Sequence, residues 1–138
     1  MNTTENRVVV SVITPTYNSS QFIGDTIESV LAQRFQDWEM LIVDDCSTDN
    51  SVEIANRFAG RDDRISTVQL SENSGAAVAR NTAISKARGR YISFLDSDDI
   101  WLAHKLETQL DFMATHQAAF CFSSYNYIDV SLIFAGLC

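Results

Sequence analysis

The chain has 138 residues, and its 46% hydrophobic and 20% charged content is ordinary for a soluble globular domain with a real core. The net charge of −8 argues against nucleic-acid binding driven by phosphate contacts. No run reaches the roughly 20 apolar residues of a membrane span, and the polar stretch Met1–Arg7 contains no signal region. The three cysteines, Cys46, Cys121 and Cys138, form neither a zinc spacing nor a disulfide framework, which favours a reducing, cytoplasmic setting.

Apolar runs and amphipathic segments alternate along the chain. Strands are predicted at Val8–Ile13, Trp38–Val43, Arg64–Leu70, Tyr91–Leu95 and Ala118–Ser123. Helices are predicted over Phe22–Leu31, Val52–Phe58, Ala76–Ala87 and Leu102–Thr115. This alternation predicts an α/β fold, with a largely parallel sheet and flanking helices joined by right-handed crossovers, in one domain over residues 1–138 whose first seven residues are disordered.

Two strands are expected to be central. Pro15 is expected to end the first strand, because proline cannot continue a central strand. Tyr91–Leu95 is an apolar run with the pattern of a strand buried on both faces.

Three carboxylates follow the strand at Tyr91–Leu95. Asp96 and Asp98 are two residues apart, so on extended backbone they face the same way, and Asp99 is adjacent. Hard oxygen ligands on one side suit Mg²⁺ or Mn²⁺. The simpler alternative is that Asp98 or Asp99 caps a helix that starts near Trp101. Capping accounts for one aspartate, whereas a metal site accounts for all three.

Polar residues collect after the other predicted strands as well. Thr16–Asn18, Asp44–Asp45 and Asn73 all follow strands, so they should share one rim of the sheet with Asp96 and Asp98. Such an acidic rim predicts a binding crevice. The chain has no glycine-rich phosphate loop, so a metal would have to carry most of the charge of a bound diphosphate.

Three rim residues have two interpretations each. Tyr17 either packs half-buried at the strand end or projects towards a ligand. Asp45 either caps the next helix or accepts an N–H from a nucleobase. Arg80, on the alanine-rich helix, either pairs with a rim aspartate or binds the ligand, and these two roles are compatible.

Four motifs resemble the family-two glycosyltransferases of the GT-A fold. They are the segments Val10–Asn18, Leu41–Asp49, Asn73–Asn81 and Asp96–Asp99, and they follow one another in the order of that family. The resemblance implies a Rossmann-like GT-A nucleotide-diphospho-sugar transferase fold. Cys46 departs from the family, which usually has glycine at that position.

The resemblance also implies residue roles. Pro15 and Tyr17 would flank the nucleobase, with Tyr17 stacking, Asp45 would hold the base edge, and Asn73 would bind the nucleotide. Arg80 would lie by the base or the diphosphate. Asp96 would contact the ribose or help to hold Mn²⁺ or Mg²⁺, and Asp98 would ligate the metal directly.

The reaction implied is transfer of a sugar from a nucleotide-diphosphate donor, a UDP-sugar, to an acceptor hydroxyl with inversion. The acceptor would be a glycan or a lipid-linked sugar of the cell envelope, and the protein would act in the cytoplasm, with membrane-associated machinery at the inner face of the membrane. The alternatives are a nucleotide-binding module without transfer and, in another class, a receiver-type signalling domain that binds Mg²⁺.

The end of the chain departs from the family pattern. In that family the catalytic base is a carboxylate well beyond the metal motif, so the base is expected beyond the chain end and is not assigned to Asp129. Residues 125–138 resemble a truncated or out-of-frame tail. The apolar residues Phe120, Phe122, Ile133 and Phe134 would then lack cover, which predicts a homo-oligomer.

Overall fold

The computed structural model describes residues 7–128. The expectations for residues 1–6, for Asp129 and for the apolar tail after it lie outside the described residues. The chain divides into two compact units, Met1–Leu106 and Glu107–Cys138. The first unit contains the whole sheet and every residue that the sequence predicts to bind a ligand.

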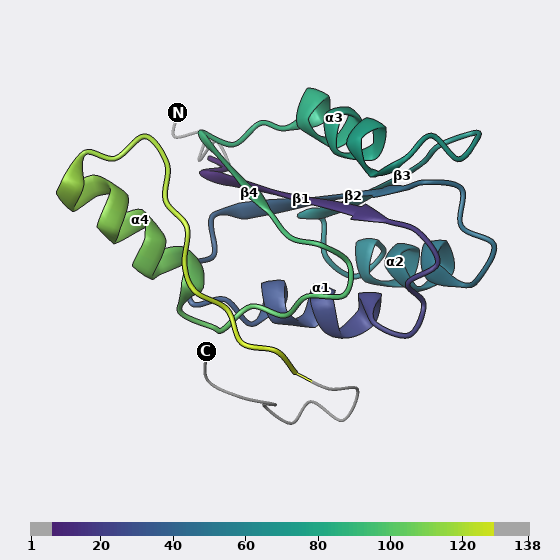
Figure 1. Ribbon diagram of the computed structural model, residues 1–138, viewed down its shortest axis with the longest axis horizontal. Helices are drawn as coiled ribbons and strands as arrows, with labels where there is room; N and C mark the ends of the chain where they lie inside the picture. Colours follow the sequence, from purple (N-terminus) through teal and green to yellow (C-terminus); the bar gives the residue numbers. More distant parts are fainter. Residues whose placement is uncertain (1–6, 129–138) are drawn as a thin grey trace, which may run out of the picture. The chain divides into compact units, whose positions relative to one another are not determined.

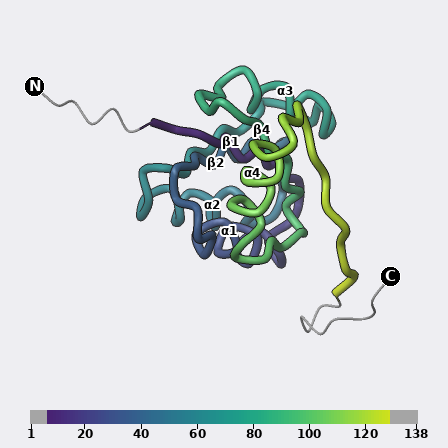
Figure 2. The backbone as a smooth tube through the Cα atoms, turned by 90° about the vertical axis from the view of Figure 1, so that its left-hand side faces the viewer, coloured from purple at the N-terminus to yellow at the C-terminus, as the bar shows by residue number. Residues whose placement is uncertain are grey.

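Strands and helices alternate as predicted. The elements are β1 (Val10–Thr16), α1 (Ile23–Leu31), β2 (Trp38–Asp44), α2 (Ser51–Ala59), β3 (Ile65–Gln69), α3 (Ala76–Lys86), β4 (Tyr91–Phe94) and α4 (Lys105–His116). The strands pair in parallel in the order β3-β2-β1-β4. Helix α3 covers one face of the sheet, and α1 and α2 cover the other (Figures 1 and 2). The predicted α/β architecture is therefore confirmed.

Every residue of β1 and β2 is buried, because alternate side chains of these central strands point to the two faces of the sheet and helices cover both faces. Ile13, Leu41 and Val43 pack against Ala79 and Ala83 of α3. Burying such a branched side chain contributes about 1.5–3 kcal/mol each. The small alanine side chains let α3 lie close to the sheet. On the other face, α1 buries an apolar stripe of Ile23, Ile27 and Val30.

The first strand does not end at Pro15, contrary to the prediction. β1 continues to Thr16, and Pro15 is paired with Val43 of β2. The carbonyl of Ile13 accepts a hydrogen bond from the N–H of Leu95, on the β4 side, so the nitrogen of Pro15 faces the same side. Pairing with β4 has already stopped at Ile13. The missing N–H of Pro15 therefore costs no ladder hydrogen bond.

The strand at Tyr91–Phe94 is not buried on both faces, contrary to the prediction. β4 is the edge strand of the described sheet, and the side chains of Ile92 and Phe94 are 40% and 56% exposed. Phe94 is level with Ile13 and so points to the face that carries α3. Because α3 packs over β1 and β2, it leaves these two side chains uncovered.

The predicted strand at Ala118–Ser123 is wrong as well. The segment is irregular, and Phe120 and Phe122 are 77% and 88% exposed. An apolar run becomes a strand only where a neighbour accepts its backbone hydrogen bonds, and no described residue pairs with this segment in a ladder. Helix α4 also starts later than predicted, at Lys105. No helix among residues 7–128 is long and apolar enough to cross a membrane.

A buried carboxylate fixes the start of β4 at the other end of the sheet. Glu39 is 3% exposed, and its carboxylate accepts hydrogen bonds from the Ser11 hydroxyl at 2.7 Å and from the Arg88 side chain at 2.8 Å. Burial opposes ionisation of Glu39, but the hydrogen bonds from Ser11 and Arg88 outweigh it and lower its pKa. Gly89 lies so close to β1 that a Cβ there would be 2.5 Å from the Ser11 nitrogen.

Candidate functional site

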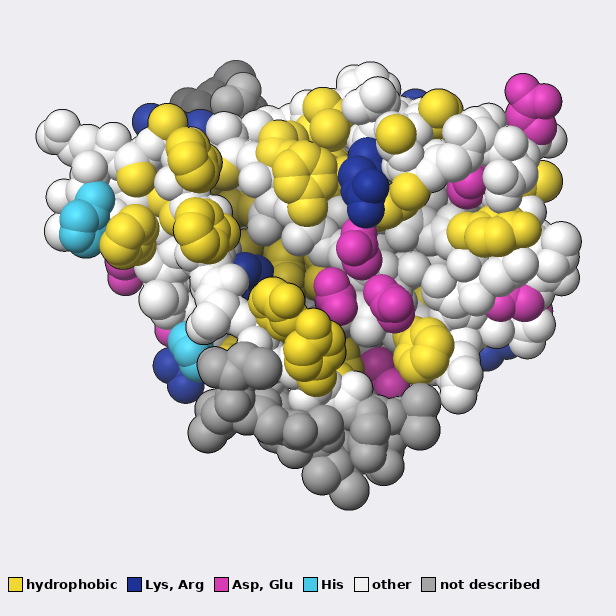
Figure 3. Space-filling model, in the orientation of Figure 1, with side chains coloured by type: hydrophobic (Ala, Val, Ile, Leu, Met, Phe, Trp, Pro, Cys, Tyr) yellow, Lys and Arg dark blue, Asp and Glu magenta, His cyan; other side chains and the backbone are white. Residues whose placement is uncertain are grey.

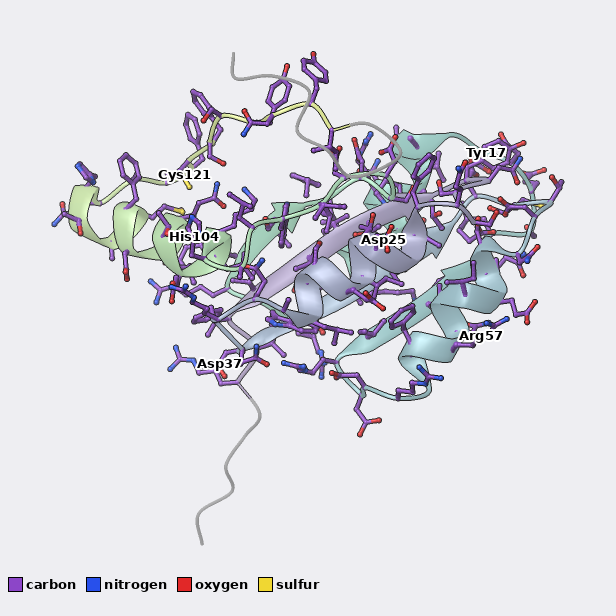
Figure 4. All side chains as sticks on the ribbon, turned by 90° about the horizontal axis from the view of Figure 1, so that it is seen from below. Tyr17, Asp25, Asp37, Arg57, His104 and Cys121 are labelled. Carbon is purple, nitrogen blue, oxygen red and sulfur yellow. The ribbon has the colours of Figure 1, made fainter. Side chains whose placement is uncertain are left out.

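The predicted rim residues do follow four parallel strands, so they share the carboxyl edge of the sheet. Thr16 at the end of β1 is level with Asp44 at the end of β2, and the N–H of Asp45 donates to the Thr16 carbonyl at 2.8 Å. Figure 4 shows Tyr17, which follows β1, and Asp37, which precedes β2, at opposite ends of the sheet. The crevice that the sequence predicts therefore belongs to the Tyr17 end.

Tyr17 projects from a loop that the next loop holds in place. Tyr17 is 50% exposed, which fits half-buried packing and also leaves part of the residue accessible to a ligand, so both interpretations stay open. Asn18 has a left-handed φ of 47° and receives support on both sides: its N–H donates to the Ser47 hydroxyl at 2.9 Å, and its Oδ1 accepts from the Thr48 N–H at 2.8 Å. The loop after β2 thus fixes the backbone that presents the ring of Tyr17.

Asp45 organises the loop before α3. It is 4% exposed, and its two carboxylate oxygens accept the backbone N–H groups of Ser74 at 2.6 Å and Gly75 at 2.8 Å. The side-chain amide of Asn73 donates to the Asp45 carbonyl at 3.2 Å. The alternative in which Asp45 caps the next helix is therefore wrong. Asp45 instead ties the end of β2 to the start of α3.

The start of α2 depends on a different aspartate. Asp49 Oδ1 accepts from the Ser51 N–H at 2.9 Å and from its hydroxyl at 2.6 Å, and Oδ2 accepts from the Ser20 N–H at 3.1 Å. Burial raises the pKa of Asp49, but the hydrogen bonds from Ser51 and Ser20 outweigh this effect and lower the pKa to about 2. Asp49 is thus a carboxylate that joins the β1 loop to α2.

Arg80 and the three carboxylates after β4 form the charged part of the site. The Arg80 Nη2 lies 2.8 Å from Asp96 Oδ1. Partial burial raises the pKa of Asp99, and the negative charges of Asp98 and Asp96 raise it further. Figure 3 shows acidic side chains gathered next to a basic one on this face of the molecule. The predicted pairing of Arg80 with a rim aspartate is confirmed.

The alternative in which Asp98 or Asp99 caps a helix near Trp101 is wrong. Helix α4 begins only at Lys105, and the Asp99 N–H closes a turn on the Asp96 carbonyl at 3.1 Å. Asp98 is exposed, and no described residue holds its carboxylate with a hydrogen bond or ion pair. Its oxygens are therefore available to a cation.

The acidic group fits a divalent cation that is shared with a ligand. Asp96, Asp98 and Asp99 offer hard oxygen donors whose mutual repulsion a cation would relieve. Among residues 7–128, no group of three or more acidic, histidine or cysteine side chains encloses a metal by itself. Mg²⁺ and Mn²⁺ are commonly held by one or two carboxylates together with substrate phosphates, so a site with an incomplete protein shell is the expected form.

The buried hydroxyls behind the acidic loop were not predicted from the sequence. Ser97 lies between Asp96 and Asp98 and is 8% exposed, and its hydroxyl lies 2.7 Å from that of Ser19. Thr26 of α1 is fully buried and donates to the Ser97 carbonyl at 3.0 Å. The signal in the sequence was the pair of hydroxyl residues, Thr26 and Ser29, among the apolar residues that α1 buries.

Cys46 takes the left-handed backbone conformation, with a φ of 64°. This conformation suits the glycine that the resemblance implied at this position. The turn nevertheless forms, since Asp44 Oδ2 accepts the Ser47 N–H at 2.8 Å across it. The cysteine therefore strains the turn without removing it.

Two cavities of the described part lie on the α2 side of the rim. One of about 200 Å³, between α2 and the sheet, is lined by Thr16, Asp44, Asn56 and Gln69 among others, and a wider hollow of about 750 Å³ lies beside it. Neither is lined by Tyr17, Arg80 or Asp98. Tyr17 and Asp98 are exposed, so this part of the rim is open to solvent.

The fold and the rim together define an α/β protein with a parallel sheet and an acidic group at its carboxyl edge. The sequence model described as Glycosyl transferase family 2 matches residues 11–135. The chain belongs to this glycosyltransferase family, whose motifs the sequence resembled.

Two curated relatives show the closeness of the match. A putative teichuronic acid biosynthesis glycosyltransferase of Bacillus subtilis, TuaG, is 55% identical over 118 residues, which are 86% of this chain and 47% of TuaG. The Escherichia coli UDP-Glc:alpha-D-GlcNAc-diphosphoundecaprenol beta-1,3-glucosyltransferase WfgD is 44% identical over 121 residues, 88% of this chain and 47% of WfgD. The chain thus spans about half the length of these relatives.

Two solved structures share the fold. S. aureus TarS 1–349 in complex with UDP superposes with a TM-score of 0.74 at 35% identity, over 79% of this chain and 33% of that one. The mannosyltransferase PcManGT from Pyrobaculum calidifontis, in complex with GDP-Man and Mn²⁺, gives a TM-score of 0.72 at 30% identity, over 78% and 33%. The GT-A fold is confirmed, and the comparisons do not favour a receiver-type domain.

Proposed function

We propose that this chain binds the nucleotide of a sugar donor at the carboxyl rim of its sheet, together with a divalent cation at Asp98 and Asp96. The observation that carries this proposal is the contact between Arg80 and Asp96, which brings a fixed positive charge beside an acidic group at the end of β4. The likeness to structures solved with UDP and with GDP-Man and Mn²⁺ supports it.

Each rim residue has a physical role in this proposal. The exposed ring of Tyr17 stacks on the base, which Pro15, Asn73 and the Asp45 loop border. Arg80 attracts the diphosphate, and Asp96 orients Arg80 and contacts the ribose or the metal. When bound, the Mn²⁺ or Mg²⁺ supplies positive charge that offsets the charge of the leaving diphosphate.

The proposed reaction is inverting sugar transfer. An acceptor hydroxyl forms a bond to the anomeric carbon, the bond from that carbon to the diphosphate breaks, and the hydroxyl proton passes to a base. No residue among 7–128 is assigned as that base. A positioned base contributes about 10²–10⁴-fold to the rate of such a transfer.

The acceptor and the setting are also part of the proposal. WfgD is named for a lipid-linked GlcNAc-diphosphoundecaprenol acceptor and TuaG for teichuronic acid biosynthesis. We therefore assign this chain to a cytoplasmic enzyme of cell-envelope glycan synthesis that uses a UDP-sugar and a lipid-linked or glycan acceptor at the inner face of the membrane.

We also propose that the chain self-associates. The high exposure of Phe120 and Phe122 supports it, while Ile133 and Phe134 lie outside the described residues. Light scattering of the 138-residue chain should give a mass above that of a monomer, and replacing both phenylalanines by serine should lower it. A monomeric parent chain would contradict this proposal.

Calorimetric titration with UDP tests the proposed function. Binding should be tighter with Mn²⁺ or Mg²⁺ than with a chelator, and tighter for UDP than for GDP or ADP at equal metal concentration. Titrating all three nucleotides separates base recognition from simple attraction of a metal diphosphate. Absence of binding for every nucleotide and metal would refute the proposal.

A further inference from the structure

Ser97 is the inward-facing residue of the acidic loop. It is 8% exposed, whereas its neighbours Asp96 and Asp98 are both exposed. The Ser97 hydroxyl lies 2.7 Å from the Ser19 hydroxyl, and the Ser97 carbonyl accepts a hydrogen bond from the Thr26 hydroxyl at 3.0 Å. Two separate segments, the loop of Ser19 and helix α1, thus hold Ser97, which lies between the two carboxylates.

The direction of the hydrogen bond between the two serines can be deduced. The Ser19 hydroxyl lies 3.2 Å from the Tyr17 carbonyl, which can only accept. A hydroxyl has a single hydrogen to donate. Because Ser19 donates to Tyr17, Ser97 must donate to Ser19. A continuous chain of hydrogen bonds therefore runs from the acidic loop to the backbone of Tyr17.

Helix α1 holds both ends of the segment from Ser97 to Trp101, which follows Asp96. Thr26 binds the carbonyl of Ser97, as described. The Ser29 hydroxyl donates to the Thr26 carbonyl at 2.7 Å and accepts the backbone N–H of Trp101 at 3.2 Å. All of these groups except the backbone of Tyr17 belong to buried residues, so water does not compete effectively for these hydrogen bonds.

We propose that Ser97, Ser19 and Thr26 are positioning residues that fix the metal-binding carboxylates relative to the Tyr17 loop. This inference rests on the proposed function and adds that cation binding and nucleotide binding are coupled through these buried hydroxyls. Exposed carboxylates on an unsupported loop would have to be ordered when the metal and diphosphate bind. The buried hydroxyls remove that cost beforehand, as residues behind metal ligands do in other sites.

The test measures how much Mn²⁺ improves UDP affinity, by calorimetry on the whole chain with and without the metal. Ser97→Ala removes the link to Ser19 and keeps the carbonyl that Thr26 binds, while Thr26→Val removes only the donor. Each should reduce the Mn²⁺-dependent gain in UDP affinity about tenfold, the size expected for one lost buried hydrogen bond. Thr26→Ser keeps the donor and should behave as the parent chain.

Ser85→Ala is the matched control, because Ser85 is exposed and its hydroxyl donates to the Thr82 carbonyl of its own helix. Circular dichroism and thermal unfolding check that each variant is folded. If Thr26→Val does not fold, Ser97→Ala alone tests the inference. If the parent chain shows Mn²⁺-dependent UDP binding and Ser97→Ala matches it, the inference fails and the proposed function stands. Equal losses with and without Mn²⁺ would reveal a structural role and also overturn the inference. A parent chain that does not bind UDP overturns both.

Discussion

Arg80 and Asp96 join α3 to the end of β4, with 2.8 Å between Nη2 and Oδ1. The two side chains are 37% and 51% exposed. At this exposure an ion pair contributes at most about 1 kcal/mol to folding. Its main consequence is therefore geometric: it fixes the guanidinium beside the acidic loop, where a diphosphate would need a positive charge.

Arg80→Ala should weaken UDP binding about tenfold, because a charge-assisted contact to the diphosphate is lost. The free energy of unfolding in urea should change by less than about 1 kcal/mol. Arg57→Ala is the control, since Arg57 forms a similar exposed pair with Glu53 at 2.7 Å on α2. Equal UDP affinities for the two variants would contradict the role of Arg80.

Asp98→Ala should abolish the dependence of UDP binding on divalent metal while the fold survives, because Asp98 is exposed and fixes no other described residue. Calorimetry with UDP and Mn²⁺ is the measurement. Asp63→Ala removes another exposed carboxylate away from the rim and should leave the metal effect intact. Unchanged metal dependence in Asp98→Ala would exclude it as a ligand.

Tyr17→Ala should weaken UDP by roughly tenfold or more, because a base stacked on an aromatic ring gains about 1–3 kcal/mol. Tyr17→Phe keeps the ring and should bind nearly as the parent chain does. Asp45→Ala should also weaken UDP, but with a loss of stability, since it leaves the N–H groups of Ser74 and Gly75 without their acceptor. UDP affinity equal to the parent's in Tyr17→Ala would rule out stacking.

Cys46→Gly should stabilise the chain by up to about 1.5 kcal/mol. The left-handed φ of 64° costs a non-glycine residue about 1–2 kcal/mol, from which the greater backbone entropy of glycine in the unfolded chain subtracts about 0.5–1 kcal/mol. Thermal unfolding measures the difference. Cys46→Ala is the matched control, because it removes the thiol, keeps the Cβ and should not bring the same gain.

Acidification should destabilise the fold through Asp49. Its pKa of about 2 lies below the ordinary 3.8, so the folded state binds this proton more weakly than the unfolded state. The contribution of Asp49 to the free energy of unfolding is fully present above pH 3.8 and is lost as the pH falls towards about 2. Urea unfolding at about pH 5 and about pH 3 should show a smaller difference for Asp49→Asn than for the parent. The lowered pKa of Glu39 acts in the same direction in both proteins.

The sequence by itself determined the alternation of elements, the parallel sheet and the rim on which the candidate residues gather. Apolar β-branched runs such as Val8–Ile13 and the carboxylates directly after Tyr91–Leu95 are local signals, and parallel strands bring their carboxyl ends together whatever the details of packing. For the same reason the pairing of Arg80 with a rim aspartate could be anticipated.

Only the tertiary structure decided which neighbour each segment has. Pro15 is tolerated inside β1 because the pairing of β1 with β4 ends at Ile13. Phe94 is exposed because α3 lies over β1 and β2. Likewise, Asp45 binds the loop before α3, and Ser97 is held by α1. A side chain's hydrogen-bond partner depends on residues far away in the chain, which no local pattern of polarity encodes, so these partners emerge only once the strands and helices are packed.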